Sequence, residues 1–264
     1  FWHVLMYSLS NSQAASSGGL FFWPRNFDLL GYKLVLQQPQ IYRAYWNTIV
    51  RTVLSTALGL ILTAALAYPL SLPRLKGGRF LCLAIFFTML FNGGMIPTYL
   101  LINDLGMIDT MWALVVPNAM SAYNLFIMRN YFKSIPQSLE ESARIDGANP
   151  VVILFRIILP ISAPTLAAVG MFYGVANWNA YLDGVLYINS TDLQILQVYL
   201  RNIFASAGSG AILSGTSGVS EASKVTEETL KMVTIAVSVI PVLIVYPYLQ
   251  KYYTKGVTVG AVKG

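Results

Sequence analysis

The chain has 264 residues, of which 56% are hydrophobic and only 11% charged, and its mean hydropathy is +0.59. This composition is too apolar for a soluble domain of that length and predicts an integral membrane protein in a lipid bilayer. A single cysteine and a single histidine exclude a disulfide framework, a zinc or other metal cluster and a Cys/His catalytic pair within the chain. The net charge of +6 comes from basic residues that are not gathered into one patch, so no nucleic-acid partner is expected.

Several charge-free intervals are each long enough to cross a bilayer as a helix. About 20 residues at a rise of about 1.5 Å span a hydrocarbon core of about 30 Å. The opening residues FWHVLMYSL are expected to be the outer end of a further span whose beginning lies outside the given sequence, because the marks of a signal peptide are missing. The sequence therefore predicts an all-α integral membrane protein with six transmembrane helices, the first truncated. The complete intervals are residues 52–73, 80–103, 110–128, 157–182 and 232–250.

The first half of the chain contains an outer segment and two interrupted spans. Residues 10–45 are expected outside the membrane, where their aromatic side chains suit interfacial packing. The first complete span, residues 46–72, contains Pro69, which should bend its inner end. The next, residues 80–102, is interrupted by Asn92-Gly93-Gly94. Backbone groups released by such a break usually find partners in a protein-lined aqueous cavity, so this break is the first indication of a pathway.

The polar segment 135–164 lies between long apolar runs and predicts a helix, a sharp turn and a second helix. Ser134 is expected to cap a short helix over residues 137–145. Gly147 suits the left-handed residue that follows a helix, and Asn149 with Pro150 is typical of the start of another.

The second half contains a long outer loop and a short tail. Residues 183–231 are expected outside, with a Gly/Ser-rich run over residues 205–223. Residues 251–264 form the tail. The loop of residues 74–79 carries three basic side chains, whereas residues 104–109 carry none, which indicates that the polar segment and the C-terminus are cytoplasmic.

The chain carries no motif for an energy-releasing reaction. It has neither a GxxxxGK[ST] phosphate loop nor a motif that pairs a covalent nucleophile with a base, so we expect no enzyme activity. If the chain moves a solute uphill without using a gradient, another polypeptide must hydrolyse ATP.

The polar segment resembles the EAA loop in membrane subunits of ATP-binding-cassette importers. The pattern is Glu141-Ser142-Ala143, three residues, Gly147, nine residues, and then Ile157-Ile158-Leu159-Pro160. Only the middle alanine of the pattern is replaced, by Ser142. The chain resembles the MalG-type carbohydrate permeases, and most closely their LplC/YtcP-like branch, which is associated with complex or acidic oligosaccharides such as alginate or pectin fragments. Further matches are Arg144, Ile145, Asp146, Ala148, Phe155, Pro164, the pair Trp178-Asn179, and the ending GVTVGAVKG at residues 256–264.

The resemblance implies the type I ABC importer fold and a bacterial cytoplasmic (inner) membrane location, with the whole of residues 1–264 as one permease domain. Implied partners are a second, homologous permease in a heterodimer, two ATP-binding subunits, an extracytoplasmic solute-binding protein, and an oligosaccharide. No cofactor is expected on this chain, since ATP and Mg would bind the ATPase subunits. Residues 133–159, the EAA loop, would couple the permease to the ATPase through a docking helix.

The site residues expected from these arguments form three groups. For docking, Ser142 and Ala143 would offer a small-residue face, and Glu141 would pair with a basic residue of the ATPase. Polar side chains in membrane helices usually face another helix or water, and aromatic rings can stack on sugars, which supplies the expected substrate path. The coupling residues are Glu141, Ser142, Ala143, Arg144, Asp146, Gly147, Phe155 and Pro160. The ATPase-interface tail comprises Lys255, Gly256, Gly260 and Lys263. The path residues are Asn92, Tyr99, Asn118, Tyr123, Asn124, Asn177, Trp178, Asn179 and Tyr181.

Two other functions remain open from the residues alone. A secondary sugar transporter driven by an ion gradient would usually need an intramembrane carboxylate or a similar relay, and the five charge-free intervals contain no Asp, Glu, Lys, Arg or His. An integral-membrane enzyme would need a convergent acid/base set, which is not visible. Basic residues of the outer segments are compatible with an acidic substrate and equally with solvated loops; these are Arg25, Lys33, Arg43, Arg51 and Arg201.

Overall fold

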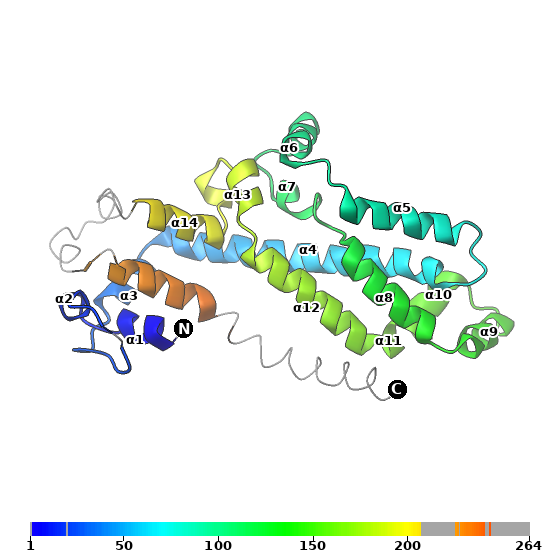
Figure 1. The fold of residues 1–264 in the computed structure, drawn as a ribbon, viewed down its shortest axis with the longest axis horizontal. Helices are drawn as coiled ribbons and strands as arrows, with labels where there is room; N and C mark the ends of the chain where they lie inside the picture. The colour runs from blue at the N-terminus through cyan, green and yellow to red at the C-terminus, as the bar shows by residue number, and fades with distance from the viewer. Residues whose placement is uncertain (1, 20, 207–224, 227, 241–242, 244–264) are drawn as a thin grey trace. The chain divides into compact units, whose positions relative to one another are not determined.

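A computed structural model describes residues 2–19, 21–206, 225–226, 228–240 and 243 (Figure 1). The chain divides into two compact units, residues 1–49 with 180–245, and residues 50–179 with 246–264. The named elements of the described part are helices, and an isolated antiparallel bridge joins Ser10 to Phe27. The predicted helical class is therefore confirmed for these residues. The tail of residues 251–264 and most of the Gly/Ser-rich run lie outside them.

The longest element is α4, Pro39–Ser71, a continuous helix of 33 residues. It includes nearly all of the predicted span 46–72 and begins earlier, at Pro39, whose fixed backbone angle suits the first residue of a helix. Within the described residues, α4 alone is long and apolar enough to cross a bilayer as one helix. Two further pairs of helices pass the same test only if each bent pair counts as one span.

The predicted interruption of the second span is confirmed as a sharp bend. Helices α5 (Gly78–Leu90) and α6 (Met95–Asp104) meet at an angle of 108°. Gly94 has a φ of 90°, a conformation that favours glycine, and Asn92 accepts a hydrogen bond from its amide at 2.9 Å. The third predicted span is likewise divided, into α7 (Met111–Val115) and α8 (Ala122–Ser134).

The EAA loop leads into the fourth predicted span through several short elements. These are α9 (Gln137–Ile145), α10 (Pro150–Ile153), a π-helical turn η1 (Leu154–Ile158) and α11 (Leu159–Ile161). Helix α12 (Ala163–Asn179) follows after a bend of 86°, which the sequence did not predict. The unit that contains them has its core where α4, α8, α9, α10 and α12 meet, with Ala67, Leu125, Met128, Ile153 and Val169 at its centre.

Glycines let α4 and α12 approach closely. A Cβ at Gly59 of α4 would lie 2.9 Å from the Ala119 carbonyl oxygen and 3.1 Å from the ring of Tyr173. The Tyr173 hydroxyl pairs with that of Thr63 at 2.7 Å and accepts the Ser121 amide at 2.9 Å. In a membrane, packing of this kind and hydrogen bonds between helices replace the hydrophobic drive.

The other unit holds the outer segments of the prediction. A core cluster of this unit joins the buried side chains Met6, Tyr7, Ala15 and Phe21. Helix α3 (Leu30–Leu36) lies close to the helix of residues 228–240, since a Cβ at Gly31 would lie 3.0 Å from the Val233 side chain. Thr226 accepts the Thr229 amide at 3.4 Å, as expected for a cap of that helix. The remaining helices are α1 (Trp2–Ser8), α2 (Ser12–Ala15), α13 (Leu182–Tyr187), the 3-10 turn η2 (Thr191–Leu193) and α14 (Leu196–Ser206).

Candidate functional site

The docking helix predicted in the EAA loop is present, and it ends as expected. Helix α9 spans Gln137–Ile145, the range predicted from the sequence. Gly147 follows with a φ of 81°, and its amide donates to the Arg144 carbonyl at 3.0 Å. The next amide, of Ala148, donates to the Ala143 carbonyl at 2.9 Å. These two bonds form a Schellman motif, so Gly147 fixes the direction in which the chain leaves α9.

Of the two helix caps predicted near α9, Asn149 is confirmed and Ser134 is not. Asn149 caps α10 as expected, because its side chain accepts the Val152 amide at 2.8 Å. The expectation for Ser134 was wrong. Ser134 is the last residue of α8, and its hydroxyl donates to the Tyr131 carbonyl at 2.7 Å. Pro136 occupies the cap position of α9 without a side-chain hydrogen bond.

The two small residues expected on the docking face, Ser142 and Ala143, differ in their exposure. Ser142 is exposed, whereas Ala143 is buried in the core of its own unit. A methyl side chain at this position allows α9 to lie close to α8 and α10, so its small size serves the fold of this chain. The exposed side chains of α9 and its turn include Glu141, Asp146 and Ile145, the last being 87% exposed.

Glu140, which the sequence did not single out, is the best-connected side chain of α9. Its carboxylate pairs with Arg144 one turn later and with Arg74 in the loop between α4 and α5. The Glu140 side chain is only 12% exposed, so these two arginines replace much of its hydration. The spacing of Glu140 and Arg144 was a usable signal, but the partner 66 residues away was not. Glu140 also faces a cavity of about 30 Å³ beside Tyr68 and Ser71 of α4.

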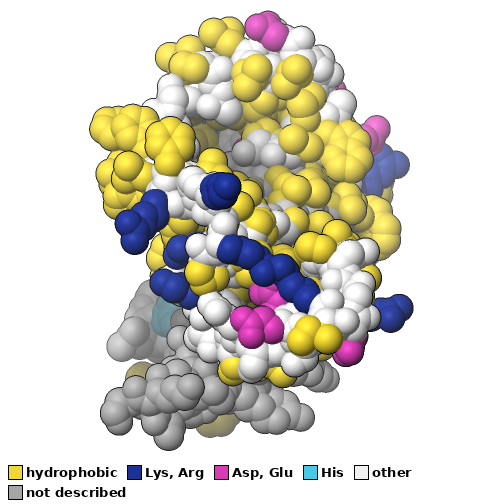
Figure 2. Space-filling view, turned by 90° about the vertical axis from the view of Figure 1, so that its right-hand side faces the viewer, with side chains coloured by type: hydrophobic (Ala, Val, Ile, Leu, Met, Phe, Trp, Pro, Cys, Tyr) yellow, Lys and Arg dark blue, Asp and Glu magenta, His cyan; other side chains and the backbone are white. Residues whose placement is uncertain are grey.

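The end of the molecule that carries α9 and α10 has both signs of charge on its surface. Figure 2 shows Lys and Arg side chains next to a smaller group of Asp and Glu side chains, with apolar side chains around them. Phe155 in η1 is 58% exposed, and Pro160 in α11 is exposed as well. A surface with apolar groups beside exposed charges can bind a protein partner.

The expected path residues are found in several different settings. Asn177 is buried, and its amide donates to the Tyr173 carbonyl of its own helix at 2.9 Å. Asn179 is exposed and bonds in the same way to Val175 at 2.9 Å. Asn124 is buried, and Trp178 is half-buried. The remaining ones are exposed: Asn92, Tyr99, Asn118, Tyr123 and Tyr181. Their role in a path stays a prediction, as do the roles of the coupling residues.

The structure changes the expectation for Arg51 and does not describe the expected ATPase-interface tail. Arg51 was grouped with the outer loops, but it lies inside α4 with 1% of its surface exposed. It therefore does not belong to a solvated loop. The tail residues Lys255, Gly256, Gly260 and Lys263 lie outside the described residues.

Comparison with known proteins identifies the family. Residues 44–259 match the family described as binding-protein-dependent transport system inner membrane component. The polygalacturonan/rhamnogalacturonan transport system permease protein YtcP of Bacillus subtilis is 40% identical over all of this chain and 92% of its own length. LplC of the same organism is 38% identical over all of this chain and 88% of its own.

A solved structure shares the fold. It is the crystal structure of a bacterial ABC transporter involved in the import of the acidic polysaccharide alginate, and one of its chains superposes with a TM-score of 0.89 at 35% identity. The match covers 96% of this chain and 89% of that one. The protein is therefore a transport subunit rather than an enzyme, and it belongs to the family of inner membrane components of binding-protein-dependent transport systems.

Proposed function

We propose that this chain is the permease subunit of an ATP-driven importer for acidic oligosaccharides and forms half of its translocation path. The observation that carries the coupling role is the geometry of the EAA loop. Helix α9 presents exposed charged and apolar side chains, and Gly147 fixes the direction in which the chain leaves it. Ala143 and Glu140 anchor α9 to its own unit. A helix held in this way can transmit a push from a partner to the membrane helices.

The mechanism proposed is alternating access. Two separate ATPase subunits bind ATP and Mg and close on each other. This closure draws together the docking helices of the two permeases, of which α9 is one. Motion of α9 would reach α4 through the Glu140–Arg74 pair and α12 through Gly147 and α10. The membrane helices would then tilt and expose the path to the opposite side.

The finer assignments belong to the same proposal. We expect six transmembrane helices, a cytoplasmic C-terminus, a heterodimer with a homologous permease, and an extracytoplasmic solute-binding protein that delivers the sugar. The substrate class rests on two relatives: YtcP is named for polygalacturonan and rhamnogalacturonan, and the similar solved transporter is involved in alginate import. Polygalacturonan and alginate are both polymers of uronate sugars.

Transport by the reconstituted complex tests the proposal. The chain, its partner permease, the ATPase subunits and the binding protein are placed in proteoliposomes, and uptake of labelled trigalacturonate is measured with ATP or with an ion gradient. ATP-dependent uptake is expected. Uptake driven by the gradient in the absence of the ATPase subunits would instead identify a secondary transporter.

A further inference from the structure

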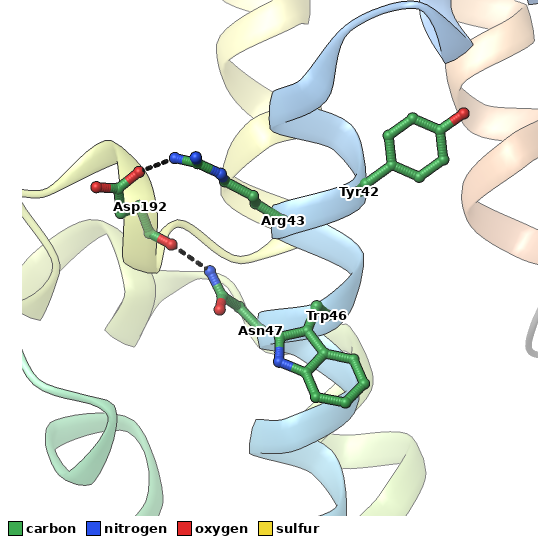
Figure 3. A pocket seen from close by; sticks show the side chains of 5 residues that line it. All are labelled: Tyr42, Arg43, Trp46, Asn47 and Asp192. Carbon is green, nitrogen blue, oxygen red and sulfur yellow. Dashed lines mark hydrogen bonds and ion pairs between the residues drawn. The ribbon is translucent and has the colours of Figure 1, made fainter.

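An open cavity lies at the first turns of α4, in the unit that holds the outer segments (Figure 3). Its volume is about 500 Å³, and it is lined by Tyr42, Arg43, Trp46, Asn47 and Asp192. In Figure 3, Arg43 and Asn47 reach toward Asp192, and the indole of Trp46 lies next to Asn47. The Tyr42 ring points away from Asp192, and the Trp46 indole, one turn further along α4, does not point toward Asp192 either, so these two rings line another side of the cavity.

One wall of this cavity is held rigidly by hydrogen bonds. The buried side chain of Asn47 donates to the carbonyl oxygens of Asp192 at 2.7 Å and Gln194 at 3.0 Å. In the next position, Thr48 accepts the Leu196 amide at 2.8 Å. These bonds attach the backbone around Asp192 to α4, so this part of the cavity is formed before any ligand arrives.

The charged groups of the cavity face water. Arg43 pairs with Asp192, and their side chains are 65% and 74% exposed, which a lipid surrounding would not tolerate. The pair uses the Nη1 atom of Arg43. Because guanidinium is a flat fork with five donors, its other edge can bind a second carboxylate in two-point fashion. Asp192 can meanwhile accept a hydrogen bond from a hydroxyl.

Trp46 adds a flat apolar surface on another side of the same cavity. Its side chain is 65% exposed. A large aromatic face of this kind can pack against the C–H face of a pyranose ring. An aromatic membrane belt alone would account for Trp46, but it would not account for an exposed ion pair and a buried amide in the same cavity.

On the basis of the proposed function, we infer that this cavity is a docking subsite for one uronate residue of an incoming acidic oligosaccharide. The Arg43 guanidinium binds the sugar carboxylate, Asp192 accepts a ring hydroxyl, and Trp46 packs on the ring. The cavity thus selects charge and ring together, and none of the predicted path residues lines it.

Ligand-observed NMR tests the inference directly. Saturation-transfer difference spectra are recorded for the assembled transporter in nanodiscs, without the binding protein, using trigalacturonate and its neutral methyl ester as probes. Arg43→Gln and Trp46→Ala should each weaken trigalacturonate binding about tenfold, as loss of one strong contact predicts. The matched controls Arg201→Gln and Trp112→Ala, also exposed and outside the cavity, should leave it unchanged. The methyl ester should bind the wild type weakly.

Three results would overturn the inference. The first is equal binding by all four variants and the wild type. The second is that Arg43→Gln weakens the binding of trigalacturonate and of its methyl ester equally, because Arg43 would then not bind the sugar carboxylate. The third is that Arg43→Gln and Trp46→Ala bind the sugar normally, but the binding protein no longer stimulates their ATP hydrolysis. The cavity would then be a contact site for the binding protein. ATP-driven uptake in proteoliposomes is measured in parallel, and its absence in the wild type would count against the proposed function instead.

Discussion

Gly147 is the residue on which the geometry of the EAA loop depends most. Its φ of 81° is costly for a side chain with a Cβ, by about 1–2 kcal/mol, although the space around it is open. Gly147→Val should therefore shift the angle between α9 and α10 without a steric clash. We expect ATP hydrolysis to continue while uptake per ATP falls severalfold, as measured in proteoliposomes.

Gly106 provides the matched control for this change. It has a φ of 67° and equally open surroundings, in a loop outside the EAA segment. Gly106→Val carries the same kind of backbone strain and should retain normal coupling. Wild-type coupling in Gly147→Val, or the same loss in both variants, would contradict the role assigned to Gly147.

Glu140 connects α9 to the loop that follows the C-terminal end of α4 through Arg74. Glu140→Gln keeps the shape of the side chain but removes its charge, which weakens both ion pairs by roughly 1 kcal/mol, because Arg74 is half exposed. Uptake per ATP should fall, and the reversed set Glu140→Arg with Arg74→Glu and Arg144→Glu, which keeps both ion pairs, should recover part of it. Lys76→Gln, in the same loop, removes a positive charge outside the pair and serves as the control. If the reversed set recovers no more uptake than Glu140→Gln alone, Glu140 and its two arginines do not act through ion pairs.

At the level of the elements, the contact between α4 and α12 depends on glycines that are not equivalent. A Cβ at Gly59 would lie 2.9 Å from a backbone oxygen, which cannot easily move, whereas one at Gly174 would lie 3.8 Å from Thr56 Oγ1. Gly59→Ala should destabilise the protein by about 1–3 kcal/mol through overpacking, and Gly174→Ala should be tolerated. The midpoints of thermal unfolding of the purified complex compare the two. Equal midpoints would show that the helices can separate at little cost.

The elements also show which structures the sequence could predict. Helix α9 was predicted to the residue because its end is set locally, by Gly147 and Asn149. Ser134 was misassigned although a local signal was present. Residues before proline avoid helical angles, so Ile135, the C-cap with a ψ of 134°, makes Ser134 the last residue of α8.

Other features depend on distant parts of the chain and could not be predicted from sequence patterns. The break at Gly94 was visible, but not its angle of 108°. The pairing of Glu140 with Arg74 and the burial of Ala143 both follow from how α4, α8 and α9 pack together. Hydropathy cannot report such contacts, because it describes one residue and its neighbours in sequence.

At the scale of the whole molecule, the family assignment agrees with the need for a partner that supplies the energy for transport. The chain belongs to a family of transport components, and the sequence has no phosphate loop, so the energy for uphill transport must enter through a partner. The exposed surface of α9 is where we propose that it enters.

Cross-linking of α9 to the ATPase subunit tests this central claim most directly. Cys82 is the only cysteine of the sequence, so Cys82→Ala gives a background for Ser142→Cys, on the exposed side of α9. This cysteine can be paired with cysteines placed along the ATPase cleft in which we propose that α9 sits. We expect a cross-link that forms within the assembled transporter and blocks uptake, and none with Gly106→Cys. Failure of Ser142→Cys to cross-link at every cleft position, in a complex that still transports, would contradict the account.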